Sequence, residues 1–364
     1  MKLGMFMMPL HPPGRIATQT LEEDRQAFLL ADRLGYCEGF VGEHVTDLAE
    51  NVTSCLMFLA SLAHETKNIV LGSGTINMPN GHPAAIAAQV AMLDHILKGR
   101  FIMGISPGGL MSDAEVFGNY QKNRNAMFVE GINTVLKIWE SDGPLDIEGE
   151  YFKVSTKQTA IPEIGQGMIL KPYQRPHPRI VGTAVAPFSP GVTEMAKRGW
   201  QPISANFLLP EWVKSHWPKY VEGRTAVGAK ADASEWRVAK SIFVADDEQT
   251  AQRYGKSQAG PYHFYFKQLT RKLLGGGRGN LFKLDQSQPD SEITPDYITN
   301  KLVIAGTVDS VVEQLLAFRE TTGDFGTLLY ACHDWVDPAL SKRSMELMAQ
   351  EVMPRLNAAI GSAA

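Results

Sequence analysis

The stretch Ile69–Leu110, IVLGSGTINMPNGHPAAIAAQVAMLDHILKGRFIMGISPGGL, indicates the fold of this chain. Its pattern predicts a strand from Ile69 to Gly72, a polar loop, a helix that begins at Pro83 and ends at Lys98-Gly99, and a second strand from Phe101 to Ile105. Proline at the start and glycine at the end of a helix are typical, and two short apolar strands around it predict a β-α-β unit. In such units the loops after the strands carry the chemistry.

The same alternation of strands and helices continues along the chain. Eight strand-like segments are each followed by a helix-like one: Leu3–Met8, Glu38–Gly42, Ile69–Gly72, Phe101–Ile105, Arg179–Gly182, Pro202–Ala205, Arg237–Ala245 and Gly326–Ala331. The pattern lapses in two excursions, 141–178 and 258–299, and the first of them contains a hairpin-like segment. We therefore predict an α/β fold, a (β/α)8 TIM barrel with insertions after strands 4 and 7, formed by one domain over residues 1–364. An open doubly wound sheet is the alternative.

Local signals predict the start of one helix and the extent of another. Thr20, with Glu23 three residues later, has the spacing of a capping box and predicts the start of the first helix. A Trp-rich segment from Pro210 to Glu222 predicts one helix.

Composition excludes several classes of protein. The chain has 364 residues, a formal charge of −4 and no run of Lys and Arg, which argues against a nucleic-acid partner. Its apolar start reaches a polar turn after about ten residues, too few for a membrane span. Cys37, Cys55 and Cys332 are too few and too scattered for a disulfide framework or a zinc cage. We expect a cytoplasmic protein without a membrane or nucleic-acid partner.

The segment Gly104–Gly108 matches G-x-S-x-G, the nucleophile elbow of serine hydrolases, and follows a predicted strand. An oxyanion hole needs the backbone N–H of the residue after the serine, and Pro107 has none. A serine hydrolase is therefore a distant alternative.

A second polar turn, Phe188 to Val192, has the features of an anion site. Ser189 suits the N-cap of a helix, Pro190 its first position, and Gly191 allows a ligand close to the backbone. The residues alone leave two interpretations open, a phosphate site or an ordinary capped helix.

Two histidines follow predicted strands at positions where a barrel carries its active residues. His44 follows Glu43, and His333 follows the last strand. An imidazole there can exchange a proton near neutral pH, although a histidine that only hydrogen-bonds a loop is the ordinary interpretation. The spacing of ligands predicts no metal site. The aromatic run Tyr262–Phe266 either lines an apolar pocket or folds back as a helix.

Taken together, these segments resemble the bacterial luciferase-like family of flavin-dependent monooxygenases. The resemblance covers nearly the whole chain and is most specific in N-G-H-P at 80–83 followed by L-D-x-x-x-x-G-R-F at 93–101. At Ser106-Pro107 the chain departs from luciferase, which carries Cys and then an Arg near the phosphate. The Ser-Pro-Gly run and the terminal His-Asp-Trp at 333–335 are closer to the limonene and diketocamphane monooxygenase branch.

The resemblance implies a barrel, usually a homodimer, that binds reduced FMN at the carboxyl ends of its strands. A separate NAD(P)H-dependent flavin reductase would supply the reduced cofactor. A non-proline cis peptide, here Gly74–Thr75, is expected beside the isoalloxazine. The expected cofactor-binding residues are Gly74, Thr75, Asn77, Ser106 and Thr183, with Ser189, Gly191 and Val192 at the phosphate. The Ala-rich helix after Pro83 is the candidate for packing against a second subunit.

The resemblance also implies the chemistry. Reduced FMN and O2 would give a C4a-(hydro)peroxide that oxygenates a small apolar organic substrate, such as a cyclic ketone, a terpene or an aldehyde. His44 inherits the catalytic position as proton donor or acceptor. Met8, Phe264, His333 and Trp335 are the expected substrate-pocket residues.

Two other functions are compatible with this resemblance. A deazaflavin-dependent dehydrogenase of the same fold would transfer hydride without O2. A non-catalytic flavin-binding relative would bind the cofactor and do neither reaction.

Overall fold

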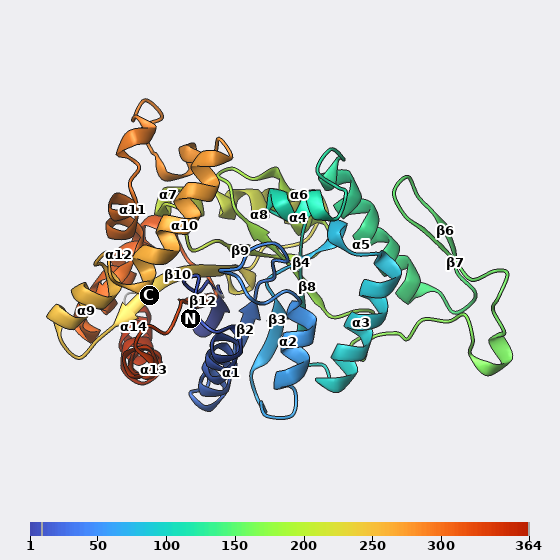
Figure 1. Ribbon diagram of the computed structural model, residues 1–364, viewed down its shortest axis with the longest axis horizontal. Coiled ribbons are helices and arrows are strands. Elements are labelled where there is room, and N and C mark those ends of the chain that lie inside the picture. Colours follow the sequence, from blue (N-terminus) through green and yellow to red (C-terminus); the bar gives the residue numbers. More distant parts are fainter. Residues whose placement is uncertain (9, 363–364) are drawn as a thin grey trace. The chain divides into compact units, whose positions relative to one another are not determined.

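The structure is a computed structural model that describes residues 1–8 and 10–362 (Figure 1). Its contacts divide the chain into two compact units. The first unit consists of Met1–Gly39 and Gly182–Ala364, and the second of Phe40–Val181. The prediction of one domain over the whole chain stays a prediction.

The first unit is built on parallel strands. They are β1 (Lys2–Met7), β9 (Gln201–Ser204), β10 (Arg237–Val244), β11 (Ile304–Gly306) and β12 (Thr327–Cys332). Strand β12 pairs with β1 from Lys2↔Thr327 to Met7↔Cys332 and with β10 on its other side. Strand β10 also pairs with β11 and β9, and all eight of its residues are buried. Burial on both faces is typical of a parallel sheet covered by helices, and it explains why β1 is an apolar run from Leu3 to Met7.

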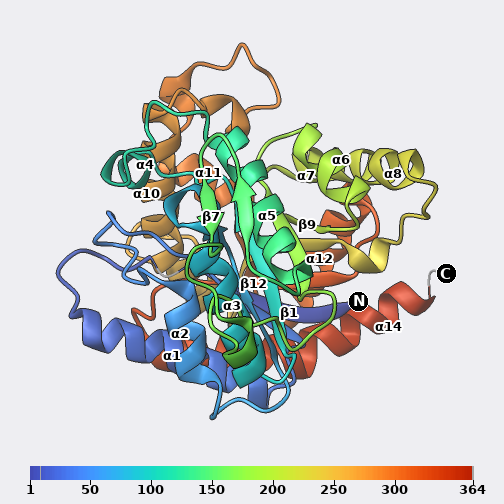
Figure 2. The ribbon, with the colours of Figure 1, turned by 90° about the vertical axis from the view of Figure 1, so that its right-hand side faces the viewer.

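Helices surround these strands. They are α1 (Ala17–Arg33), α6 (Pro190–Lys197), α7 (Pro210–Lys214), α8 (His216–Ala226), α9 (Glu248–Gly255), α10 (Pro261–Gly275), α11 (Pro295–Leu302), α12 (Val308–Thr322), α13 (Pro338–Leu347) and α14 (Met353–Ser362). Figure 2 shows α6 and α8 side by side, and Gly223 allows this packing because a Cβ there would lie 2.3 Å from Thr193 O.

The second unit contains the β-α-β pattern of the stretch 69–110. Strand β3 (Val70–Ser73) pairs in parallel with β5 (Phe101–Ser106), and the short β4 (Ile76–Asn77) extends this pairing. Its helices are α2 (Cys55–Leu62), α3 (Pro83–Ile96), α4 (Met111–Val116) and α5 (Arg124–Glu140). Helices α3 and α5 lie side by side in both ribbon views. The predicted hairpin of the first excursion is present as β6 (Asp146–Glu148) and β7 (Lys153–Ser155).

The remaining strands, β2 (Glu38–Val41) and β8 (Arg179–Ala184), complete the sheet. Its hydrogen-bonded order is β11-β10-β12-β1-β2-β3-β5-β8-β9, and β9 pairs with β10. Because that last pairing closes the path, the eight predicted strands form a closed ring. The predicted (β/α)8 barrel, with insertions after its fourth and seventh strands, is confirmed.

Two local predictions were wrong, and two short strands were missed. The first helix begins at Ala17, with Ile16 at the N-cap, and the Thr20 hydroxyl donates to Ala17 O at 3.1 Å from inside the helix. The segment 210–222 forms two helices, because Pro218 has no N–H to donate across the break at Ser215. The short strands β4 and β11 were not predicted.

The second excursion is largely helical. The aromatic run Tyr262–Phe266 lies within α10, so the helical alternative for this segment is confirmed. Over the part of the chain that the structure describes, no helix is long and apolar enough to cross a membrane.

Candidate active site

In the second unit, His44 is held by the loop after β2. Its backbone N–H donates to Val52 O at 3.1 Å. Its Nδ1 lies 2.8 Å from Asp113 Oδ2, and its Nε2 lies 3.6 Å from Glu50 Oε2. The ring is partly exposed, whereas both carboxylates are buried. Solvent can therefore reach the imidazole of His44, while the two buried carboxylates hold the ring in place.

Asp113, on α4, is fixed by several donors. Its Oδ1 accepts from the Thr46 backbone N–H at 2.9 Å and from the Thr46 hydroxyl at 2.6 Å. Burial alone would raise the pKa of this carboxyl, but the hydrogen bonds from His44 and Thr46 outweigh it and lower the pKa to about 2. An ionised carboxylate can only accept, so the proton of His44 at this contact must be on Nδ1. Nε2 is left as the nitrogen that exchanges a proton.

Three of the predicted flavin-binding residues form one network. The Thr75 hydroxyl donates to Ser106 Oγ at 2.8 Å, and Ser106 Oγ donates to Asn77 Oδ1 at 2.9 Å. The peptide bond between Gly74 and Thr75 is cis, as the resemblance implied. Ser106 donates its single hydroxyl hydrogen to Asn77. It does not donate this hydrogen to a histidine, as a catalytic serine would. This observation adds to the case against a serine hydrolase.

Glu43 connects the two clusters. Its Oε1 accepts from Asn77 N–H at 3.3 Å, and its backbone O accepts from Asn77 Nδ2 at 3.2 Å. Its Oε2 accepts from Cys55 N–H at 3.0 Å. The loop that carries His44 is thereby tied to the loop that carries Asn77.

The partners offered by this network are hydroxyl, carboxamide and backbone groups. Such neutral donors and acceptors suit a heterocycle with an alternating polar edge, as in an isoalloxazine ring, better than a metal ion. The backbone is also closely packed here, because a Cβ at Gly42 would lie 3.3 Å from Gly74 O. The residues present in the second unit therefore fit a flavin ring.

In the first unit, the predicted phosphate residues lie at the start of α6. Ser189 is at the N-cap and Pro190 follows it, and in the described residues the Ser189 side chain makes no capping hydrogen bond to the helix. Gly191 is exposed, while Val192 is buried and its amide donates to Ser189 O at 3.1 Å. The Ser189 hydroxyl and the exposed backbone of Gly191 are the groups that an anion can reach. Thr183, in β8, is partly buried.

The predicted pocket residues of the first unit are only partly brought together. His333 Nε2 lies 3.0 Å from Ser241 Oγ, and the ring packs against Tyr262 and Tyr265 with centroids 4.6 and 4.5 Å apart. Burial lowers the pKa of His333 to about 3, which keeps the ring neutral. His333 and Trp335 line a cavity of about 10 Å³, which has room for about one water.

Phe264 and Met8 are partly buried. The aromatic rings against His333 come from Tyr262 and Tyr265, on the same helix as Phe264, so the sequence identified the helix but not the side chains. The assignment of Met8, Phe264, His333 and Trp335 to a substrate pocket stays a prediction.

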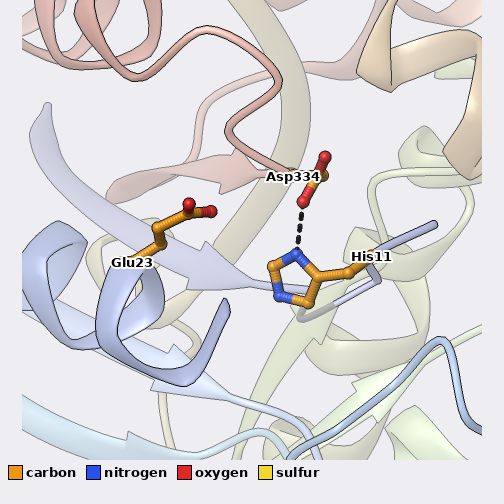
Figure 3. A group of neighbouring side chains, drawn as sticks. All are labelled: His11, Glu23 and Asp334. Atoms are coloured by element: carbon orange, nitrogen blue, oxygen red, sulfur yellow. Dashed lines mark hydrogen bonds and ion pairs between the residues drawn. The ribbon is translucent and has the colours of Figure 1, made fainter. Parts of the chain in front are cut away.

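A buried charge network near the ends of β1 and β12 was missed from sequence (Figure 3). His11 Nδ1 lies 2.5 Å from Asp334 Oδ1, and His11 Nε2 lies 3.1 Å from Asp24 Oδ2. Burial would lower the pKa of His11, but the two aspartates outweigh it and raise the pKa to about 9. The network therefore contains a buried imidazolium.

His11, Glu23 and Asp334 are close enough to bind one metal ion. Both nitrogens of His11 are already paired, and Arg15 donates to Asp334 at 2.7 Å and to Glu23 at 2.6 Å. A protonated histidine cannot be a ligand, so the cluster is a network of ion pairs.

No direct signal in the sequence pointed to Asp113. An acidic residue in the first turn of the helix after β5 is the one feature that could have indicated it. The sequence shows that Glu43 is next to His44, but its contacts with Asn77 and Cys55 are evident only in the structure.

Comparison with known proteins identifies relatives along the chain. The family model of luciferase-like monooxygenases matches residues 1–324. The 3,6-diketocamphane 1,6-monooxygenase of Pseudomonas putida is 28% identical, and the match covers 98% of both chains. Limonene 1,2-monooxygenase of Rhodococcus erythropolis is 26% identical over 98% of this chain and 87% of its own.

One solved structure of the Pseudomonas putida protein is similar along the same length. It is the oxygenating constituent of 3,6-diketocamphane monooxygenase, a type II Baeyer-Villiger monooxygenase, in complex with FMN. It is 28% identical and superposes with a TM-score of 0.87 over 98% of both chains.

Proposed function

The chain belongs to the luciferase-like monooxygenase family, and from this premise we propose that it is the oxygenating component of a two-component, FMN-dependent monooxygenase. Its substrate is a small apolar organic molecule, such as a cyclic ketone, a terpene or an aldehyde. A separate NAD(P)H-dependent flavin reductase supplies reduced FMN. The observation that carries the proposal is the network Thr75–Ser106–Asn77, tied through Glu43 to a partly exposed His44 that is oriented by Asp113.

FMN is bound, in this proposal, by the predicted cofactor-binding residues. Gly74, Thr75, Asn77 and Ser106 contact the isoalloxazine ring. Thr183 and the turn at Ser189, Gly191 and Val192 contact the rest of the cofactor, with the turn at its phosphate. When bound, reduced FMN supplies the two electrons with which one atom of O2 enters the substrate and the other becomes water.

His44 is the residue that moves a proton. Asp113 holds its Nδ1–H at 2.8 Å, so the ring keeps one orientation while Nε2 gains or loses a proton. The loop amides of Val45 and Thr46 bind the same carboxylate, at 3.2 and 2.9 Å, and keep it from turning away. With FMN bound, Nε2 of His44 would donate or accept the proton that the transfer of oxygen to the substrate requires.

Three further features belong to the proposal. The protein is a homodimer, it acts in the cytoplasm, and residues 1–364 work as one domain. The Ala-rich helix α3 supports the dimer, because small side chains let two helices approach closely, and its Met92 is 55% exposed.

Reconstitution tests the proposed function. The protein is titrated with reduced FMN and with a reduced deazaflavin, and O2 uptake and products are measured with a flavin reductase and a panel of cyclic ketones, terpenes and aldehydes. Binding of FMN with O2-dependent product supports the proposal. Hydride transfer with the deazaflavin alone would make the chain a dehydrogenase, and flavin binding without either reaction would make it a non-catalytic relative.

A further inference from the structure

His333, directly after β12, has one ring nitrogen without a partner. Its Nε2 lies 3.0 Å from Ser241 Oγ, whereas its buried Nδ1 has no hydrogen-bond partner in the part of the chain that the structure describes. Asn206 Nδ2 donates to Ser241 Oγ at 3.0 Å, and the Tyr265 hydroxyl donates to Asn206 Oδ1 at 3.1 Å. Because Asn206 Nδ2 can only donate, the hydroxyl hydrogen of Ser241 goes to Nε2 of His333.

This arrangement determines where His333 carries its proton. Burial lowers the pKa of the ring to about 3, so the imidazole is neutral and has a single N–H at neutral pH. Because Nε2 accepts from Ser241, that proton is on Nδ1. Nδ1–H is thus a buried donor, and a buried donor without an acceptor is strongly unfavourable.

Asp334, the next residue, carries a buried acceptor without a donor. Its Oδ1 accepts from His11 Nδ1 at 2.5 Å and from Arg15 Nη1 at 2.7 Å. Its Oδ2 has no hydrogen-bond partner within residues 1–8 and 10–362. Figure 3 shows that this second oxygen points away from His11. The side chain of Asp334 is only 1% exposed, so bulk solvent does not reach the oxygen.

His333 and Asp334 line the same small cavity. Its volume of about 10 Å³ has room for about one water molecule, and Tyr254 and Ser341 also line it. The hydroxyl oxygens of these two residues lie 2.8 Å apart and offer lone pairs to a second hydrogen of a bound molecule. A donor, an acceptor and room for one small molecule are the features of a buried water site. Dioxygen does not fit these groups, because it has no hydrogen to donate to Asp334 Oδ2.

We propose that this cavity binds one water molecule, which accepts from His333 Nδ1–H and donates to Asp334 Oδ2. The water joins two networks of the first unit that the protein groups alone leave separate. One is the hydrogen-bonded chain from Tyr265 to His333, and the other is the set of ion pairs around His11. The site requires neither FMN nor a substrate, so it does not depend on the proposed function.

Two measurements on the full-length wild type test the site. A crystal structure at a resolution that orders buried water should show one water at about 2.7–3.2 Å from both His333 Nδ1 and Asp334 Oδ2. Nitrogen NMR of isotope-labelled histidine should show His333 as the Nδ1–H tautomer, with a nuclear Overhauser effect between this proton and a long-lived water. A dry cavity that binds xenon under pressure would overturn the proposal. An Nε2–H tautomer, or a direct hydrogen bond between His333 and Asp334, would also overturn it.

His333→Phe removes the donor but keeps an aromatic ring beside Tyr262 and Tyr265. We expect one long-lived water fewer than in the wild type, measured by magnetic relaxation dispersion of the solvent. Tyr262→Phe is the matched control, because Tyr262 also lines the cavity but its hydroxyl already donates to Ile242 O. It should retain the water. Equal numbers of long-lived waters in the wild type and His333→Phe would overturn the proposal, and so would an equal loss in both variants, because the water would then not depend on Nδ1–H.

Discussion

His44 Nδ1 and Asp113 Oδ2 lie 2.8 Å apart, although the two residues are 69 positions apart in the sequence. The hydrogen bond joins the loop after β2 to the helix after β5. It selects the tautomer of the one histidine that the sequence indicated as catalytic.

Replacing His44 with Ala should separate flavin binding from oxygen transfer. The network of Thr75, Ser106 and Asn77 does not include the imidazole, so we expect FMN affinity close to that of the wild type. Loss of a positioned acid or base should lower the rate of product formation about 100-fold or more. Reduced FMN should still consume O2, and the ratio of product to O2 measures the loss. An unchanged ratio would remove His44 from the mechanism.

Asp113→Asn should have a smaller effect than loss of the imidazole. The carboxamide can still contact Nδ1, but it no longer attracts the ring as a charge or excludes the other tautomer. We expect partial uncoupling, and a mixture of tautomers in nitrogen NMR of isotope-labelled histidine. Glu50→Gln is the comparison, because Glu50 faces Nε2 at the longer distance of 3.6 Å. A single Nδ1–H tautomer in Asp113→Asn would contradict the assigned role.

The ion-pair network of His11 should make stability depend on pH on the alkaline side. The pKa of His11 is raised in the folded state from 6.5 to about 9, so its contribution is fully present below pH 6.5 and is lost as pH rises through 9. Urea unfolding of the wild type at pH 6.5 and pH 9 should show this loss. His11→Gln should be less stable at pH 6.5 and should lack this component of the decline. The same slope in both proteins would show that His11 is not charged in the fold.

Gly104→Ala should destabilise the second unit strongly. A Cβ at Gly104 would lie 1.9 Å from Ser73 O, and strand β5 approaches β3 closely at this point. Overpacking of this kind costs about 1–3 kcal/mol or more, measured as the change in free energy of unfolding in urea. Gly109→Ala is the control, because its Cβ would meet no atom within 4 Å, and it should change stability by about 0.5 kcal/mol or less. Equal effects of the two substitutions would contradict the packing derived for β3 and β5.

The fold could be predicted from the sequence because its signals are local. Apolar strands, Pro83 at a helix start and Lys98-Gly99 at its end were found where expected, with left-handed φ angles of 52° and 83° at Lys98 and Gly99. The residues of the site were harder to predict from the sequence. Asp113 is recognised by its contact with His44, and a contact across 69 residues leaves no trace in a local pattern.

The wrong boundaries have a similar origin. Thr20 and Glu23 have the spacing of a capping box, but Ile16 has the extended conformation that begins the helix one turn earlier. Strands of two or three residues, such as β4 and β11, are defined by their neighbours in the sheet and not by their own composition.

We propose that this protein transfers an oxygen atom from O2 to an organic substrate with reduced FMN. The most direct test of this proposal is turnover under heavy-isotope O2 with FMN, a flavin reductase and the panel of cyclic ketones, terpenes and aldehydes, followed by mass spectrometry of the products. We expect a product that carries one labelled oxygen atom and that is lost in His44→Ala. Turnover of a substrate with FMN or a deazaflavin that leaves no label in any product would contradict it.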